Sequence, residues 1–312
     1  MPISNRSRTR LAATILALAL ATGGAAGLIG GAAPPAAGTP PSPGAPVSEQ
    51  TEQVLLFDDF DGTSLDTSLW TPGLHQWGSD NNGVVPENVW LDTVSDGAGG
   101  RLSALVTRAN GDDYDGSVRG IKATDASYPI GDPRRYTRQD TGVRTGGLVW
   151  TNERYGAGRY EVRMKALPYS GGCSCVWNYY NPDDGSDYTE IDIEIPAAGT
   201  ADRSDWRQWV GFNSYIAPTA AGGTSEDVDV NIDNHDGAFH TYRWDWYDGS
   251  GGTARIEFYI DDIHFTTQTL TVPTSPAPLW VGNWAAHWSG SFDYDTQYLY
   301  VDWVRISTLP AS

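Results

Sequence analysis

Cysteine is nearly absent from this sequence, since only Cys173 and Cys175 occur in 312 residues. A small disulfide-held scaffold is therefore excluded, and a buried apolar core has to stabilise the fold. At the i, i+2 spacing of an extended strand the two Cα atoms would lie roughly 6.6 Å apart, near the upper limit for a disulfide. A disulfide and two free thiols both remain open. A metal site is disfavoured because no histidine lies nearby at ligand spacing.

Basic residues are also scarce. The chain has 20 Lys and Arg against 39 Asp and Glu, which gives a formal net charge of −19. A surface of this sign repels nucleic acid and anionic polymers, so we expect a neutral ligand and no nucleic-acid partner.

Helical periodicity is missing from the folded part of the chain. The 36 Gly and 19 Pro interrupt it too often for long helices. Residues 159–165, 255–261 and 298–306 instead alternate between apolar and polar side chains, as half-buried strands do. Asp261 and Asp262 are predicted to form a hairpin turn. The sequence therefore predicts an all-β sandwich of two antiparallel sheets, of the jelly-roll type.

The first residues differ from the rest in composition. Three arginines, the apolar run of residues 11–20 and then small residues predict a secretory signal peptide over residues 1–33. A membrane anchor is the alternative, but its second half would consist of Gly and Ala, which insert weakly. Residues 34–53 read as a linker rich in Pro, Ala and Gly. Residues 54–309 are then predicted to form a single catalytic domain, since their number suits one large all-β domain.

Aromatic residues are abundant by contrast. The 13 Trp and 16 Tyr exceed what a core of this size needs, and many alternate with polar residues. Any single ring is best explained by ordinary packing. As a set, however, they predict a groove in which flat rings stack on the apolar faces of sugars.

Residues 189–195 combine three acids with three isoleucines in strict alternation. In an extended strand the isoleucines share one face, and Glu190, Asp192 and Glu194 share the other. The two glutamates lie about 13 Å apart at Cα, and their carboxylates can approach to roughly 5 to 6 Å, the separation found in retaining glycosidases. Asp192 can hydrogen-bond a neighbour and keep the acid partly protonated.

The Glu-Ile-Asp-Ile-Glu sequence resembles the signature of glycoside hydrolase family 16. Residues 155–165, 240–246 and 301–306 also resemble segments of that family, in the same order. The resemblance implies a jelly roll whose concave face carries the signature strand in a substrate cleft. It also implies that Glu190 is the nucleophile, Glu194 the general acid/base and Asp192 the assisting residue.

The signature contains no extra residue that would bulge the strand. In this it resembles the signatures of the lichenase and xyloglucan-active branches rather than those of many laminarinases. The resemblance implies substrate contacts from Asn213 and Tyr215, within Phe-Asn-Ser-Tyr, and from Trp177 and Tyr179 on the strand before the signature. Core packing is the alternative for the last two.

Other segments depart from the lichenase pattern. Residues 146–150 lack a Glu and an Arg that lichenases use for substrate, and the late Asn-Leu-Trp is replaced by Gly-Asn-Trp. Asn283, Trp284 and Trp288 remain candidates for the groove, and Trp77 for an outer subsite.

The resemblance also implies a structural calcium ion held by Asp302 and by backbone oxygens, one of them from Gly100. The alternative is that Asp302 only caps a sheet edge. His240 is a weaker candidate for the cleft, since a lone histidine is more often structural.

These features predict a secreted, monomeric, endo-acting retaining glycosidase on β-1,3 or mixed-linkage β-1,3-1,4-glucan, with no cofactor for catalysis. The same mechanism on xyloglucan or a galactan is one alternative. A non-catalytic glucan-binding jelly roll is another, although such relatives usually lose an acid.

Overall fold

The computed structural model describes residues 52–182 and 186–309 of the chain. The predicted signal peptide, residues 1–33, lies outside these ranges, as does the predicted linker, residues 34–53, except for its last two residues. No helix within the described residues has the length and apolarity needed to cross a membrane.

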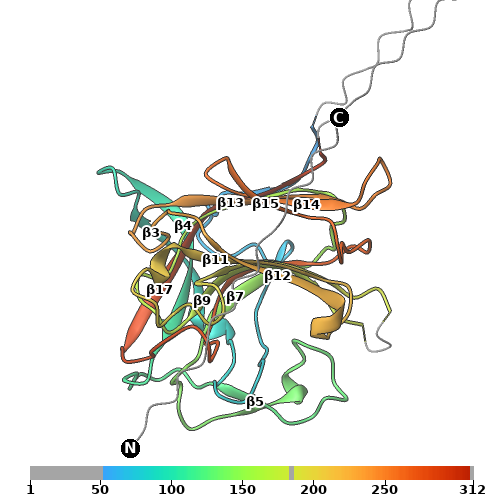
Figure 1. The fold of residues 1–312 in the computed structure, drawn as a ribbon. Helices are drawn as coiled ribbons and strands as arrows, with labels where there is room; N and C mark the ends of the chain where they lie inside the picture. Colours follow the sequence, from blue (N-terminus) through green and yellow to red (C-terminus); the bar gives the residue numbers. More distant parts are fainter. Residues whose placement is uncertain (1–51, 183–185, 310–312) are drawn as a thin grey trace, which may run out of the picture. The chain divides into compact units, whose positions relative to one another are not determined.

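Two antiparallel sheets form the body of the domain, and Figure 1 shows them as two stacked layers. The first, here called the cover sheet, has the strand order β15-β14-β13-β8-β17-β4-β3, and β1 adds to β17. Its strands are β1 (Val54–Asp58), β3 (Val89–Ser95), β4 (Arg101–Asn110), β8 (Gly158–Lys165), β13 (His240–Tyr247), β14 (Arg255–Ile260), β15 (Ile263–Gln268) and β17 (Thr296–Ser307).

The second sheet, here called the groove sheet, has the order β12-β11-β10-β9-β16-β7-β2. Its strands are β2 (Trp70–Pro72), β7 (Gly147–Thr151), β9 (Cys173–Tyr180), β10 (Thr189–Ile195), β11 (Trp209–Tyr215), β12 (Gly223–Asp229) and β16 (Leu279–Trp284). The predicted all-β jelly roll of two antiparallel sheets is confirmed.

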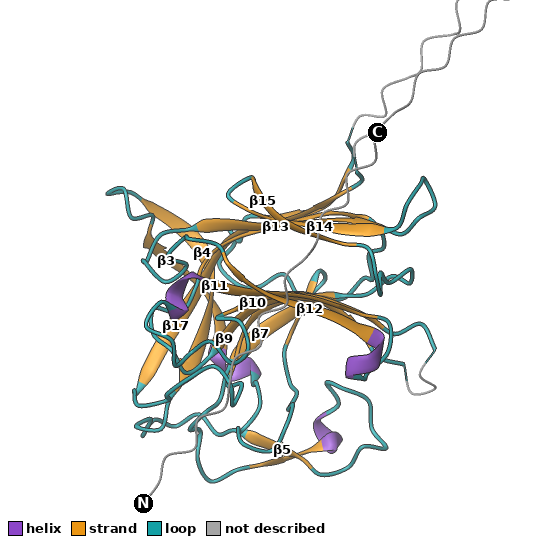
Figure 2. Ribbon diagram, in the orientation of Figure 1, coloured by secondary structure: helices purple, strands orange, loops and turns teal. Residues whose placement is uncertain are grey.

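A short hairpin of β5 (Ile121–Ala123) and β6 (Tyr136–Arg138) lies beyond the groove sheet, on the side away from the cover sheet (Figure 2). The helices of the described residues are single 3₁₀ turns, namely η1 (Pro86–Asn88), η2 (Pro133–Arg135), η3 (Trp206–Gln208) and η4 (Ala220–Gly222). The expectation of no long helix is therefore confirmed for this part of the chain.

The core fills the space between the two sheets. The isoleucines of β10 meet the large side chains of the cover sheet there, including Tyr160, Trp244 and Trp246. Trp244 donates its indole N–H to Oδ1 of Asn178, at 3.0 Å, and so connects the core to β9. Three buried aromatic rings of this size contribute several kcal/mol, at about 25 cal/mol per Å² of apolar area.

The predicted strands match the structure closely. Residues 159–165 lie in β8, residues 255–261 cover β14, and residues 298–306 lie in β17. Asp261 and Asp262 both adopt positive φ, 49° and 63°, between paired residues Ile260 and Ile263. This is the two-residue hairpin geometry that the sequence predicted, because Asp tolerates the left-handed conformation better than most residues.

Candidate active site

The acids of β10 all lie on one face of the groove sheet. The isoleucines at 191, 193 and 195 are fully buried in the core, whereas Glu190 and Glu194 are partly exposed. Asp192, between them, is only 5% exposed. The predicted division of this strand into an apolar face and an acidic face is confirmed.

Strand β10 pairs without interruption on both sides. Its register with β9 and with β11 has no bulge, as the sequence predicted. The pairing creates three cross-strand rows, which run Tyr179–Glu190–Tyr215, Trp177–Asp192–Asn213 and Cys175–Glu194–Gly211. Side chains of one row share a face of the sheet, so each acid has an identified neighbour on either side.

Two adjoining pockets share the three acids. Aromatic rings dominate the first, which is lined by Trp77, Cys175, Trp177, Tyr179, Glu190, Asp192, Glu194 and Trp284. The second is lined by Tyr188, Ala198, Asn213, Tyr215, Ala217, Pro218, Thr219, Ser225 and Trp288, together with the same acids. The carboxylates therefore stand in the middle of a longer groove that has rings on both sides.

Glu190 has a phenol as its hydrogen-bond partner, because the hydroxyl of Tyr188 donates to its Oε2. Burial raises the pKa of Glu190, and this hydrogen bond opposes the rise by stabilising the charged form. Tyr188 itself has a raised pKa, through burial first and then the adjacent Glu190 charge, so it stays a donor.

Glu194 has a different environment. The amide of Asn213 donates to its Oε2 at 3.1 Å, and the hydroxyl of Ser225 donates to Oδ1 of Asn213 at 2.5 Å, which fixes the orientation of that amide. Burial raises the pKa of Glu194 to about 7, and the charges of Glu190 and Asp227 add to the effect. Near neutral pH Glu194 therefore carries a proton in a large fraction of molecules.

Asp192 is the most deeply placed of the three. Burial raises its pKa well above the usual range, and the charges of Glu190 and Glu194 raise it further. A protonated Asp192 adds a hydrogen-bond donor between the glutamates instead of a third negative charge.

An acid triad on one strand, in which the two glutamates accept from different donors, a phenol at Glu190 and an amide at Glu194, can carry out acid-assisted nucleophilic substitution. Residues 113–305 of the chain match the family model of glycosyl hydrolases family 16. The chain belongs to this family. The predicted family membership is thus confirmed, over more than half of the chain.

Relatives of this family 16 protein include two bacterial enzymes. It is 36% identical over 156 residues to a β-glucanase of Bacillus subtilis (strain 168). This match covers 48% of this chain and 58% of that protein. It is 33% identical over 156 residues to a β-glucanase of Bacillus amyloliquefaciens, with 48% and 59% covered. The matched region thus spans less than two thirds of either relative's length.

The fold has a solved counterpart in the β-glucanase of Bacillus licheniformis. The TM-score is 0.55 at 24% identity, and the match covers 83% of this chain and 100% of the other. At that identity the likeness supports the jelly-roll fold.

Most of the predicted binding residues of the family 16 protein do line the groove. Trp177, Tyr179 and Trp284 face the first pocket, and Asn213, Tyr215 and Trp288 face the second. Trp77, predicted for an outer subsite, also lines the first pocket and makes ring contacts with Trp177, Trp280 and Trp284 at 5.6 to 6.0 Å.

Asn283 was wrongly predicted to face the groove. Its side chain is fully buried, and its amide donates to Oγ1 of Thr107 in the cover sheet at 2.8 Å. Strand β16 pairs Gly282 with Cys175 and Trp284 with Cys173, so these even-numbered residues face the groove and Asn283 faces the core.

Sequence reasoning missed several residues of the groove and its surroundings, among them Tyr188, Trp280, Ser225 and Asp227. Tyr188 precedes Glu190 by two residues and Trp280 precedes Gly282 by two, so strand periodicity could have found both. Ser225 and Asp227 lie on β12, and they reach the acids only through the pairing of β12 with β11. No local signal in the sequence indicates that pairing.

The predicted calcium ligands do not come together. Asp302 accepts a hydrogen bond from Arg163, so a guanidinium already neutralises its carboxylate. Val301, next to Asp302, pairs with Leu105, and Gly100 lies five residues before Leu105, roughly 16 Å away along a strand. Asp302 and Gly100 therefore do not meet as ligands of one ion, and calcium binding stays a prediction.

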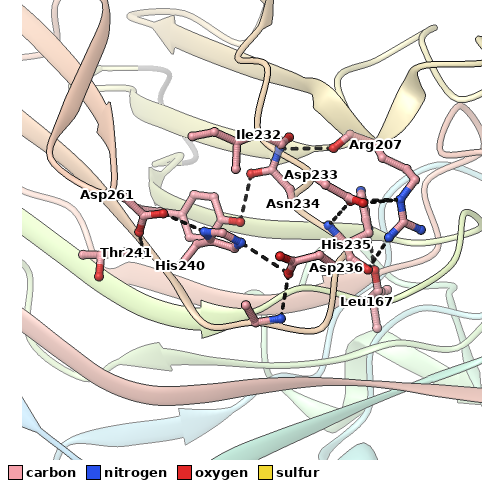
Figure 3. Close-up of polar contacts among 12 residues, drawn as sticks. Leu167, Arg207, Ile232, Asp233, Asn234, His235, Asp236, His240, Thr241 and Asp261 are labelled. Atoms are coloured by element: carbon pink, nitrogen blue, oxygen red, sulfur yellow. Dashed lines mark hydrogen bonds and ion pairs between the residues drawn. The ribbon is translucent and has the colours of Figure 1, made fainter. Parts of the chain in front are cut away.

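His240 lines neither pocket. It begins β13 in the cover sheet, where its Nδ1 lies 2.6 Å from Oδ2 of Asp261 and its Nε2 lies 3.4 Å from Oδ1 of Asp236. Figure 3 shows the ring held between these two carboxylates. His240 thus connects the loop that contains Asp236 to the hairpin turn that contains Asp261, which is a structural role.

Proposed function

We propose that this family 16 protein is a secreted, endo-acting β-glucanase that hydrolyses β-1,3 or mixed-linkage β-1,3-1,4-glucan with retention of anomeric configuration. The β-glucanase names of its Bacillus relatives support the choice of substrate class. The observation that carries the proposal is the difference between the surroundings of Glu190 and Glu194.

Glu190 is suited to be the nucleophile, since its hydrogen bond from Tyr188 favours the charged carboxylate. Glu194 is suited to be the acid/base, since its pKa of about 7 lets it hold a proton near neutral pH and release it later. Sequence spacing could not distinguish the two glutamates, but this asymmetry does favour one assignment.

The reaction then takes two steps. Glu190 attacks the anomeric carbon while Glu194 gives its proton to the glycosidic oxygen, so the C–O bond breaks and a glycosyl ester forms on Glu190. In the second step Glu194 removes a proton from water, the water oxygen attacks the same carbon, and Glu190 leaves as a carboxylate. Asp192, on the same face between the two glutamates, assists them. Two inversions give overall retention.

Attack within a chain is supported by the length of the groove. A further open pocket continues from Tyr179 past Trp280 and Trp150 towards Arg135 of the η2 turn. The acids thus have space for sugar units on both sides, and the paired rings of Trp150 and Trp280, 4.3 Å apart, offer a stacking surface away from the reacting bond.

The proposal is tested by incubating wild type, Glu190→Gln and Glu194→Gln with barley β-glucan, laminarin and xyloglucan. We expect wild type to release oligosaccharides from β-glucan or laminarin, with a rapid fall in viscosity, and each variant to lose about 10³-fold or more in rate. Proton NMR of the first products should show the β-anomer before mutarotation.

Glu257→Gln is the matched control, because Glu257 lies on β14 of the cover sheet and accepts from Arg255 there. It should keep wild-type activity. Release of no reducing ends from β-glucan and laminarin would defeat the glucanase assignment, and an α-anomer as first product would defeat retention. Binding of β-glucan without hydrolysis would favour a carbohydrate-binding protein instead.

Secretion rests on the basic, apolar and small-residue segments within residues 1–33. Expression of the full chain in a secreting bacterial host should place a shortened protein in the medium. N-terminal sequencing would give its first residue, and retention of the intact chain in the membrane fraction would favour an anchor.

A further inference from the structure

The two cysteines lie on the floor of the catalytic groove. They belong to β9, where Cys175 pairs with Glu194 of β10 on one side and with Gly282 of β16 on the other. Cys173 is two residues along on the same face, and a disulfide joins the two with Cα atoms 5.6 Å apart. Cys173 is buried, and Cys175 is 3% exposed where it lines the first pocket.

The acid/base completes this cluster. The Sγ atoms of Cys173 and Cys175 and a carboxylate oxygen of Glu194 all lie within 4.8 Å of one another. This set is the sole group of His, Cys, Asp and Glu with metal-ligand spacing among the described residues. Neither reaction step above uses the sulfur atoms, so their position beside the acid/base needs its own explanation.

The surroundings of the cluster favour a cation. Along the same row, Gly211 separates Glu194 from Asp227, and Gly211 has no side chain to shield one carboxylate from the other. Gly282 flanks Cys175 on the other side. The row therefore places Glu194 beside Cys175, with Asp227 two strands further on, and contains no basic side chain, which is a favourable field for a divalent ion.

We propose that reduction of the Cys173–Cys175 disulfide converts the groove floor into an inhibitory binding site for a soft divalent cation such as Zn²⁺. A phosphine reductant supplies two electrons and takes the oxygen of water to become a phosphine oxide, and the disulfide becomes two thiols. The cation then displaces both thiol protons and binds two thiolates and the Glu194 carboxylate.

This donor set suits zinc. Zinc takes thiolate sulfur at about 2.3 Å and carboxylate oxygen at about 2.0 to 2.2 Å, with a fourth position left for water. The three ligand atoms lie within 4.8 Å of one another, which is about the spacing of atoms that share one zinc ion. In the disulfide the sulfurs are neutral and bonded to each other, so the oxidised protein has no such site.

Occupation would stop turnover, because a carboxylate that binds a metal cannot hold the proton for the leaving group. The inference goes beyond the proposed function, since it rests on three side chains and not on the polysaccharide. A readout independent of hydrolysis therefore distinguishes the two ideas.

The experiment compares full-length wild type with the Cys173→Ser/Cys175→Ser variant. Each protein is prepared with and without reduction by tris(2-carboxyethyl)phosphine. The reductant is then removed, and Cd²⁺ is added as the probe. Ultraviolet absorption reports cadmium–thiolate bonds, and near-ultraviolet circular dichroism reports the fold. Each sample is then assayed with Zn²⁺ on barley β-glucan relative to its own metal-free rate.

We expect the thiolate absorption only in reduced wild type, together with a loss of about tenfold or more in rate that EDTA reverses. Reduced Glu194→Gln should keep the absorption but bind Cd²⁺ about tenfold more weakly. The proposal is overturned if reduced, folded wild type shows no such absorption, if the serine variant is inhibited equally, or if reduction abolishes the fold. Absorption without any hydrolysis in wild type would support the metal site and count against the glucanase.

Discussion

The hydroxyl of Tyr188 donates a hydrogen bond to Oε2 of Glu190, two residues further along the chain. The contact stabilises the charged form of this carboxylate and opposes the rise in pKa that burial causes. Of the two glutamates, the proposed nucleophile is thus the one with a phenol as donor.

Tyr188→Phe should therefore raise the pKa of Glu190. The acidic limb of the pH profile of kcat/KM should move to higher pH, with a loss of about tenfold at the low end of the active range. Tyr259→Phe is a matched control, because Tyr259 donates to Oε2 of Glu257 at 2.9 Å, also two residues away, on the cover sheet. A profile for Tyr188→Phe that overlays wild type would contradict the role.

Asp227→Asn should shift the alkaline limb of the pH profile of kcat. Asp227 pairs with Gly211, which pairs with Glu194, so the two carboxyl groups share a face roughly 10 Å apart at Cα. The charge of Asp227 adds to the burial that raises the pKa of Glu194. Its removal should lower that pKa, and the alkaline limb of the kcat profile should move to lower pH. Asp229→Asn, two residues along β12, is the control and should leave the limb in place.

His235 should make the fold sensitive to acid. Burial lowers its pKa to about 4, and its Nδ1 contacts the carbonyl oxygen of Leu167 (Figure 3). Between about pH 6.5 and pH 4 only the unfolded chain takes up this proton, so stability falls by about 3 kcal/mol as pH drops through that window. His235→Gln should flatten this part of a plot of denaturant midpoint against pH. An unchanged slope would contradict the assignment.

The contribution of His240 to folding stability should depend on pH in the opposite direction to that of His235. The hydrogen bond with Asp261 raises its pKa above the usual 6.5, and Asp236 adds to the effect. Its stabilisation is fully present below the unfolded pKa and is lost as pH rises through the folded pKa. His240→Gln should therefore lower Tm by about 2–4 °C at pH 5 and by less at pH 9. Equal losses at both pH values would argue against a charged His240.

Removal of metal ions should leave the thermal stability unchanged. Arg163 donates to Asp302, so we expect no shift of Tm on dialysis against EDTA. Asp302→Asn should lower Tm by a few degrees through the loss of about 1 kcal/mol from this partly buried pair. A clear loss of Tm in EDTA that Ca²⁺ restores would contradict this and revive the predicted calcium ion.

The acidic face of β10 could be predicted because it depends only on local alternation. Neighbours two residues apart share a face of a strand whatever the strand pairs with. The same rule would have placed Asn283 on the core face, since Gly282 and Trp284 occupy the groove face of β16. That prediction failed because a family motif was transferred without regard to the parity of the strand.

Contacts between strands could not be predicted in the same way. Asp227 reaches Glu194 through two pairings, and Arg163 reaches Asp302 across β8 and β17, 139 residues away in the chain. Such pairings depend on register and topology, which a single sequence specifies only through the global fold. The electrostatic surroundings of the acids therefore became apparent only in three dimensions.

Strand β10 is an interior strand, which pairs with β9 over residues 189–195 and with β11 over residues 190–194. The groove walls, by contrast, include residues from connecting segments, such as Trp77, Pro218 and Trp288. The proposed reacting carboxyl groups and part of the proposed binding surface are thus carried by separate segments of the chain. Replacement of those connections could change which polysaccharide binds and leave the reacting carboxyl groups undisturbed, so this scaffold should accept grafted loops without losing its chemistry.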